Sequence, residues 1–192
     1  LGGAGTINVA RIRGLSPEVG TTYGVQLAQT MTVKLLDIFE SKLIPLGSSK
    51  PVLNFPGGVV RRLVVRNSHM KVGALQPCIY LGGGTVNEIA LSGNLISAET
   101  SGAGDLIQCD FAASLTKVSF DGTRTEPGAF GPSSILVFSD VAMGNLDIFV
   151  DNHDVLSASG IRSSGTGLTG TVNVYLGGAV KWTAIGGNNF LQ

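Results

Sequence analysis

The sequence predicts an all-β protein: a single-domain antiparallel β-sandwich or barrel with long loops and at most one or two short helices. Its apolar runs are short, contain many β-branched residues, and are bounded by Gly, Pro, Asn, Asp or Ser. These runs recur at a spacing of about 8–12 residues, which is typical of sandwiches and barrels rather than of alternating strands and helices. No low-complexity linker divides the 192 residues, so we expect one domain spanning residues 1–192.

Residues 1–5 are predicted to form a flexible, glycine-rich arm. In the first strand Ile7 and Val9 alternate, whereas Ala10 and Ile12 are one step out of phase. Residues 25–36 also show helical spacing, but their threonines and their period of two favour a strand, and one helical turn is expected within 36–43. The longest predicted loop is 121–134. The expected strands are 6–13, 25–36, 52–55, 59–67, 76–81, 88–91, 95–98, 105–111, 115–120, 135–139, 146–150, 155–161, 168–176 and 179–185.

The central stretch of this prediction is 59–84, interpreted as two strands joined by a polar loop and closed by three glycines. Its ending, Tyr-Leu-Gly-Gly at 80–83, recurs at 175–178. The match does not extend beyond a strand and its turn, so we interpret it as coincidence rather than duplication. A solenoid requires a shorter period repeated at least three times. We find no such period, and a solenoid is therefore not expected.

The chain carries few charges for its length. Charged residues make up 14% of it, with 13 basic and 13 acidic side chains, against roughly 25% in an ordinary soluble domain. Either Ser, Thr, Asn and Gly cover the surface, or other subunits bury much of it. No run approaches the ~18 apolar residues of a spanning helix, and the N-terminal residues lack the features of a signal peptide. We favour burial against copies of the same chain.

The sequence contains no catalytic motif, and we predict that the protein is not an enzyme. His69 and His153 are the only histidines, and no pattern connects them to a nucleophile or a carboxylate. Residues 165–170 match G-x-G-x-x-G, but they precede a strand instead of opening a helix, so we interpret them as a loop. No organic cofactor is expected.

One acidic cluster is a weak candidate for a metal site. Asp147, Asp151 and Asp154 supply the oxygen ligands that suit Ca²⁺. The alternative is that the segment around Asn152 is simply a turn, for which Asp and Asn are favourable. Calcium is the only cofactor that the sequence suggests.

One basic cluster, Arg61, Arg62 and Arg66, lies on the predicted strand 59–67. These side chains could bind phosphate or pair with carboxylates of a neighbouring subunit, and we favour the second hypothesis. The net charge is zero and there is no polybasic tail, so sequence-specific nucleic-acid binding is not expected.

The two cysteines, Cys78 and Cys109, lie in apolar runs without C-x-x-C spacing. Cys109 alternates with Ile107 and Phe111, which predicts a buried side chain. A disulfide between the two stays open at this point.

In size and strand density the chain resembles the single-barrel (jelly-roll) coat proteins of icosahedral viruses and small β-sandwich virion proteins of phages. The segments concerned are Leu-Val-Val-Arg-Asn at 63–67, followed through a loop by Cys-Ile-Tyr-Leu-Gly-Gly at 78–83. The resemblance implies an eight-stranded barrel that assembles into a virion shell with copies of itself and other virion proteins. Since a basic arm is missing, it implies a double-stranded DNA virus, with the genome neutralised elsewhere or behind an internal membrane.

The alternative is a secreted or cell-surface β-sandwich that binds carbohydrate, such as a lectin, an adhesin or a fibre tip. Such sites need an exposed aromatic platform with polar partners. Trp182 and the acidic cluster of residues 147–154 are the candidates for these roles.

Overall fold

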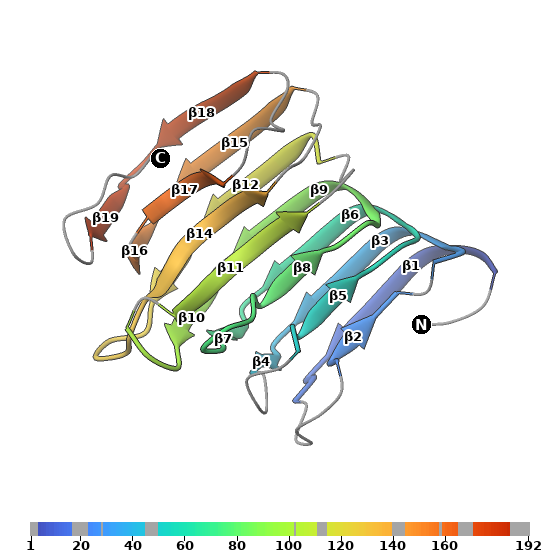
Figure 1. Cartoon of the computed structure of the whole chain (residues 1–192), viewed down its shortest axis with the longest axis horizontal. Helices are drawn as coiled ribbons and strands as arrows, with labels where there is room; N and C mark the ends of the chain where they lie inside the picture. Colours follow the sequence, from blue (N-terminus) through green and yellow to red (C-terminus); the bar gives the residue numbers. More distant parts are fainter. Residues whose placement is uncertain are drawn as a thin grey trace.

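In the computed structural model the chain winds into a β-solenoid built from three parallel sheets (Figure 1). The structure describes residues 4–16, 23–27, 29–44, 50–101, 103–110, 115–139, 145–157, 159–164 and 171–184. All named strand pairs are parallel, and the antiparallel contact described is an isolated bridge between Ala98 and Phe130. The predicted antiparallel sandwich or jelly-roll barrel is therefore wrong, although the all-β class is right.

The three sheets take one strand each from every complete turn of the solenoid; the first turn has no described strand in sheet C, and the last has none in sheet B. Sheet A contains β1 (Gly5–Arg13), β3 (Met31–Phe39), β6 (Val59–Arg66), β9 (Thr85–Ser92), β12 (Lys117–Asp121), β15 (Leu146–Asp151) and β18 (Val172–Gly177). Sheet B contains β2 (Val25–Gln26), β5 (Leu53–Phe55), β8 (Ile79–Leu81), β11 (Ala103–Asp110), β14 (Pro132–Ser139) and β17 (Ser159–Ser164). Sheet C contains β4 (Lys42–Leu43), β7 (His69–Val72), β10 (Leu95–Ala98), β13 (Arg124–Thr125), β16 (Asp154–Ser157) and β19 (Lys181–Ala184).

The length of a turn varies along the solenoid, which hides the repeat in the sequence. In one turn Val59 pairs with Thr85. In a later turn Lys117 pairs with Asp147, so that turn is longer than the earlier one. Because insertions at the corners change the period, the apolar pattern has no constant repeat. The expectation that the chain is not a solenoid failed for this reason.

One corner, however, is built in the same way in every turn. The residue that directly follows each sheet A strand has a positive φ, and the chain bends there toward sheet C. Gly and Asn adopt this left-handed conformation at the lowest cost, and only one of these residues is of another type. The seven corner residues are Gly14, Glu40, Asn67, Gly93, Gly122, Asn152 and Gly178.

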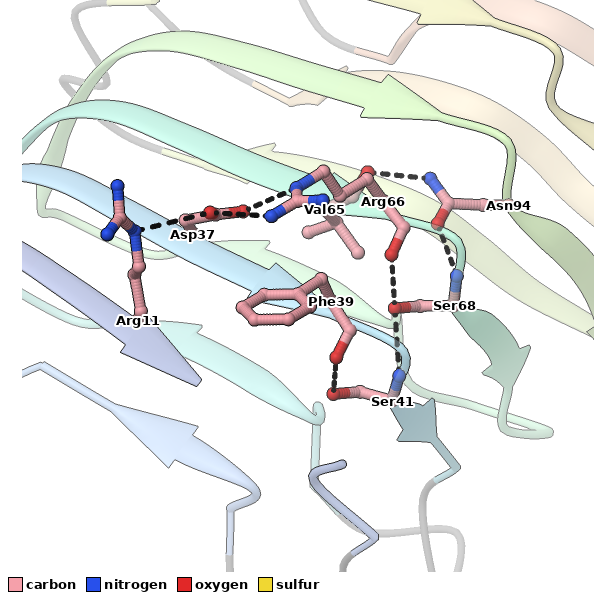
Figure 2. Close-up of polar contacts among 8 residues, drawn as sticks. All are labelled: Arg11, Asp37, Phe39, Ser41, Val65, Arg66, Ser68 and Asn94. Carbon is pink, nitrogen blue, oxygen red and sulfur yellow. Dashed lines mark hydrogen bonds and ion pairs between the residues drawn. The ribbon is translucent and has the colours of Figure 1, made fainter. Parts of the chain in front are cut away.

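Buried polar side chains connect successive corners, as Figure 2 shows. The Ser41 amide donates to Ser68 Oγ at 3.1 Å, and the Ser68 amide donates to Asn94 Oδ1 at 3.0 Å. Asn94 Nδ2 donates in turn to the Val65 carbonyl at 2.8 Å. These bonds satisfy backbone groups that the bend leaves without a partner in the sheets, which is the condition for burying them.

The next two turns place Thr123 and His153 at the same inner position of the corner, since Leu95 pairs with Arg124 and Arg124 with Asp154. Both side chains are buried. The His153 ring packs edge-on against Phe120, with centroids 5.6 Å apart. Burial lowers the pKa of His153 to about 4, against a smaller opposing effect of Asp154. The imidazole is thus neutral at physiological pH.

Inside the solenoid, apolar side chains stack in columns along the axis. Sheet A contributes Leu36, Leu63 and Ile89 from successive turns, all buried. Such stacking buries most of the large apolar side chains of the chain. Among the described residues, six large hydrophobic side chains are exposed: Val9, Leu75, Phe130, Phe149, Tyr175 and Leu176.

Cys78 and Cys109 are both buried and unpaired. Burial raises the pKa of Cys78 to about 12 and raises that of Cys109 as well. We therefore expect neither thiol to react with an aromatic disulfide reagent at neutral pH until the protein unfolds, because the thiolate is the nucleophile. Labelling with and without denaturant tests this, and two reactive thiols per chain should appear only in denaturant. A native protein that labels fast, or a denatured one with no free thiol, would contradict it.

Several strand boundaries also differ from the prediction. β7 lies within the expected loop after 59–67, and 155–161 is divided between β16 and β17. The expected loop 121–134 contains β13 and the start of β14, and the expected strand 25–36 is divided between β2 and β3. Residues 36–43 contain the end of β3, the corner and β4 instead of a helical turn. Of the expected arm, Gly5 already belongs to β1, while residues 1–3 and the glycine-rich motif at 165–170 lie outside the described residues. The two Tyr-Leu-Gly-Gly copies occupy different sheets, β8 in sheet B and β18 in sheet A.

Candidate functional site: the outer face of sheet A

The outer face of sheet A carries the side chains that point away from the core. Strand register stacks them in columns along the solenoid axis, one residue from each turn. The first column contains Arg62, Glu88, Lys117, Asp147 and Asn173; the second contains Val64, Ala90, Ser119, Phe149 and Tyr175; the third contains Arg66, Ser92, Asp121, Asp151 and Gly177.

A groove of about 290 Å³ lies on this face across β9, β12 and β15, and we call it the sheet A groove. Ala90 and Ser119 form its floor, because the middle column has short side chains there. Charged residues of the first and third columns border it, and Phe149 stands at one end. The lining residues are Arg62, Glu88, Ile89, Ala90, Lys117, Ser119, Phe120, Asp121, Phe149 and Asp151.

The aromatic end of the groove is a stacked pair. The Phe149 and Tyr175 rings have centroids 4.7 Å apart and an angle of 12° between their planes. This separation equals the strand spacing of about 4.8 Å, so the rings stack along the solenoid axis. Tyr175 covers one face of Phe149, and the other face is directed toward Ser119. Lys117 Nζ lies 5.0 Å from the centroid of Phe149, within cation–π distance.

Charges of both signs alternate around the groove. Arg62 Nε lies 3.7 Å from Glu88 Oε2, and Asn152 Nδ2 donates to Asp121 Oδ1 at 3.3 Å. Asp121 and Asp151 are paired in register on neighbouring strands. Asp151 Oδ1 is buried and has no hydrogen-bond partner among the described residues. The border of the groove therefore carries both donors and acceptors.

The structure does not bring the predicted calcium ligands together. Asp147 and Asp151 lie four residues apart on the outer face of β15, about 13 Å along a strand. Asp154 lies beyond the corner in sheet C, with its Oδ1 atom 3.6 Å from Lys181 Nζ. Within the described residues no group of three or more His, Cys, Asp or Glu side chains could hold a metal ion.

The three predicted arginines differ in their surroundings. Arg62 borders the sheet A groove and Arg61 is exposed beside it. Arg66 is bound twice by Asp37, through Nε–Oδ1 at 3.0 Å and Nη2–Oδ2 at 3.1 Å, and its guanidinium lies 4.4 Å from the centroid of Phe39 (Figure 2). The hydrogen bond to Asp37 raises the pKa of Arg66. Arg62 and Arg66 thus lie beside carboxylates of their own chain; contact of this cluster with a neighbouring subunit stays a prediction.

His69 has polar partners, but not in a catalytic arrangement. Its Nε2 atom lies 2.7 Å from Ser97 Oγ and 3.3 Å from Glu126 Oε2. A catalytic triad requires the carboxylate on the other ring nitrogen, so that it orients the base. Here the hydroxyl and the carboxylate share one nitrogen, and the geometry does not activate Ser97.

Trp182 does not take part in the sheet A groove. It lies on β19 in sheet C, where its Nε1 atom donates to Ser157 Oγ at 2.8 Å. The exposed aromatic residue of the groove, Phe149, and its stacking partner Tyr175 were not predicted from the sequence. The available signal was their sequence separation, which is the same as that between the register partners Leu146 and Val172 on β15 and β18.

No protein-family model, curated protein or solved structure matches this chain. In the part of the chain that the structure describes, no helix is long and apolar enough to cross a bilayer. The chemistry of the sheet A groove is the observation from which a function can be argued.

Proposed function

We propose that the protein binds a glycan chain in the sheet A groove. The observation that carries the proposal is the combination of an aromatic ring face with polar groups around a shallow, open depression. A sugar ring presents an apolar face of C–H groups and a rim of hydroxyls. Phe149, which is 36% exposed, offers a surface for the first, where the sugar would replace Lys117 Nζ beside the ring. The bordering side chains offer partners for the second.

The polar border suits hydroxyl groups better than phosphates. Glu88, Asp121 and Asp151 can accept hydrogen bonds from hydroxyls, while Arg62 and Lys117 can donate to them. Three carboxylates around two cations repel a polyanion, which requires a net positive surface. The ligand class is therefore a neutral or weakly charged oligosaccharide.

The shape of the groove suits a linear ligand. Short side chains, Val64, Ala90 and Ser119, occupy the middle column over three successive turns. Neighbouring strands lie about 4.8 Å apart, so this row of three short side chains is about 10 Å long. A glycan chain lying along the solenoid axis would place successive groups against successive turns.

Two variants test the site on an array of neutral, acetamido and uronic-acid oligosaccharides, followed by titration calorimetry on the best binder. Ser119→Phe fills the floor and should abolish binding. Phe149→Ala removes the ring and should weaken binding about tenfold, or roughly 1.4 kcal/mol. Phe130→Ala is the matched control, because Phe130 is 54% exposed but lies outside the groove. A wild-type protein that binds no array member, or Ser119→Phe binding as well as wild type, would overturn the proposal.

The expectation of a virion shell subunit stays a prediction, as do its virion location and partners. That expectation started from the low content of charged residues, 14%. Among the described residues the solenoid core buries most of the large apolar side chains without a partner chain. That the protein is not an enzyme and has no organic cofactor also stays a prediction.

A further inference from the structure

Within the described residues, the first and last strands of sheet A have open edges at opposite ends of the solenoid (Figure 1). Among the described strands β1 pairs with β3 alone, and β18 pairs with β15 alone. β1 is nine residues long. Long open edges offer unpaired backbone groups to another strand, so these two edges are the candidate interaction surfaces.

We propose that copies of this chain stack head to tail, with β1 of one copy adding as a parallel strand to β18 of another. Strand addition of this kind obtains its affinity from main-chain hydrogen bonds. The two edges belong to different surfaces, so the contact does not close on itself, and repetition yields an open filament.

The columns of sheet A predict the register of this contact. Within the chain each turn places its residues in the same columns as the turn before, as Phe149 and Tyr175 show. Continuing the columns from β18 to β1 of the next copy sets Asn173 beside Val9, Tyr175 beside Arg11 and Gly177 beside Arg13. Gly178 then meets Gly14, and both have the positive φ of the corner, 57° and 66°. The bends of the two copies coincide.

In this register the inward columns continue the core. Ala10 and Ile12 occupy the same inward columns as Val174 and Leu176. Leu176 is 62% exposed at the end of its column, whereas Val150 in the turn before it is buried. A further turn would cover Leu176 with Ile12, and burying this apolar surface favours association.

The outward columns bring opposite charges and an aromatic face together. Tyr175 is 48% exposed, and the ring face that points away from Phe149 has no described neighbour along the solenoid axis. Arg11 of the next copy would lie against that face, as Arg66 lies over Phe39 within the chain. Gly177 has no side chain, so the exposed Arg13 side chain, which bonds Glu40 of its own chain at 2.7 Å, would reach past it toward the Asp151 carboxylate of the other copy.

Charge complementarity identifies the occupant as a second copy of this chain. The β1 end presents Arg11 and Arg13, which are largely exposed although their Nε atoms lie 3.9 Å from Asp37 Oδ2 and 2.7 Å from Glu40 Oε2 of the same chain. The β18 end presents Asp147 and Asp151 on the neighbouring strand. In the stack the two arginines would lie between the carboxylates of both copies, and the apolar columns and the corner conformation of the two ends also match.

The test is the mass of the full chain by light scattering and sedimentation over a range of concentrations, with electron microscopy of the largest species. Wild type should form species whose mass rises with concentration and falls with added salt. Leu176→Asp should raise the dissociation constant at least about tenfold. Leu75→Asp, at a residue 78% exposed and outside both edges, should leave it unchanged.

Exchanging the charges of the two ends distinguishes a specific loss of this contact from a general loss of solubility or of the fold. Arg13→Asp alone and Asp151→Arg alone should each block stacking, and mixing the two variants should restore it. Ser119→Phe should still stack, so failure of glycan binding and failure of stacking are distinguishable. A wild type that is monomeric at every concentration, or association that none of these changes affects, would overturn the proposal.

Discussion

Gly131→Ala is expected to destabilise the protein by about 4 kcal/mol or more, or to prevent folding. A methyl group on Gly131 would overlap the carbonyl oxygen of Leu156 and lie 2.6 Å from its carbonyl carbon. Leu156 belongs to β16, which pairs with β13 and β19. The obstructing atoms are backbone held by two neighbouring strands, so they cannot rotate away as the end of a side chain could.

Urea unfolding, followed by circular dichroism and by the single tryptophan, measures this loss. Gly128→Ala is the matched control from the same loop. Gly128 has a φ of 77° and no atom within 4 Å of a built methyl group, so its replacement should cost only the left-handed backbone penalty of about 1–2 kcal/mol. Equal losses in the two variants would show that the close approach of Gly131 to β16 does not exist.

The second large effect is a loss of stability in acid through His153. Burial, the larger cause, lowers the pKa of the folded imidazole to about 4, against about 6.5 in the unfolded chain. Below pH 6.5 the unfolded state therefore binds a proton that the folded state does not. The stabilising contribution is complete above pH 6.5, decreases as the pH falls, and is lost near pH 4. Its full size is about 3 kcal/mol.

The comparison that checks this is the free energy of unfolding at pH 7 and at pH 4.5 in three proteins. Wild type should lose more stability on acidification than His153→Leu, which has no imidazole to protonate at the corner. His69→Gln serves as the control, because His69 is partly exposed on sheet C, and it should behave as wild type. If His153→Leu loses as much as wild type, carboxylates and not His153 account for the acid sensitivity.

The positions of the strands could be predicted from the sequence because they depend on the alternation of apolar and polar residues over a few positions. Residues 95–98 were expected as a strand and form β10. The change of phase in the first strand is also real, but it falls between Ile7 and Val9, since Ile7, Ala10 and Ile12 pack against the core while Val9 is exposed. This change of phase within β1 does not indicate that β1 pairs with β3, a full turn further along the chain.

The parallel arrangement of the strands could not be predicted from local sequence in the same way. A strand of alternating residues looks alike in a sandwich and in a solenoid, and the two differ in which strands become neighbours. The recurring Gly or Asn after each sheet A strand carried that information, but the corner insertions obscured it. Glu40 obscured it further, because its left-handed φ of 49° is unusual for glutamate.

The candidate site was harder to predict from the sequence than the strands, because the register between strands decides which of its residues lie side by side. Asp151 and Asp154 are close in sequence, yet the corner at Asn152 sends them to different sheets. Phe149 and Tyr175 are far apart in sequence, yet neighbouring turns stack their rings. The floor of the sheet A groove exists because two strands from successive turns, β9 and β12, place the short side chains of Ala90 and Ser119 side by side.

The amino-acid sequence by itself determined that the chain is all β, where most strands lie, and that Cys109 is buried, because alternation and turn residues act within a few positions. Only the tertiary structure decided that the sheets are parallel, which side chains share the outer face of sheet A, and which edges stay open. Those features arise from hydrogen bonds between strands a full turn apart, such as β6 with β9 and β12 with β15. No local pattern specifies a partner at that distance when the corners vary in length.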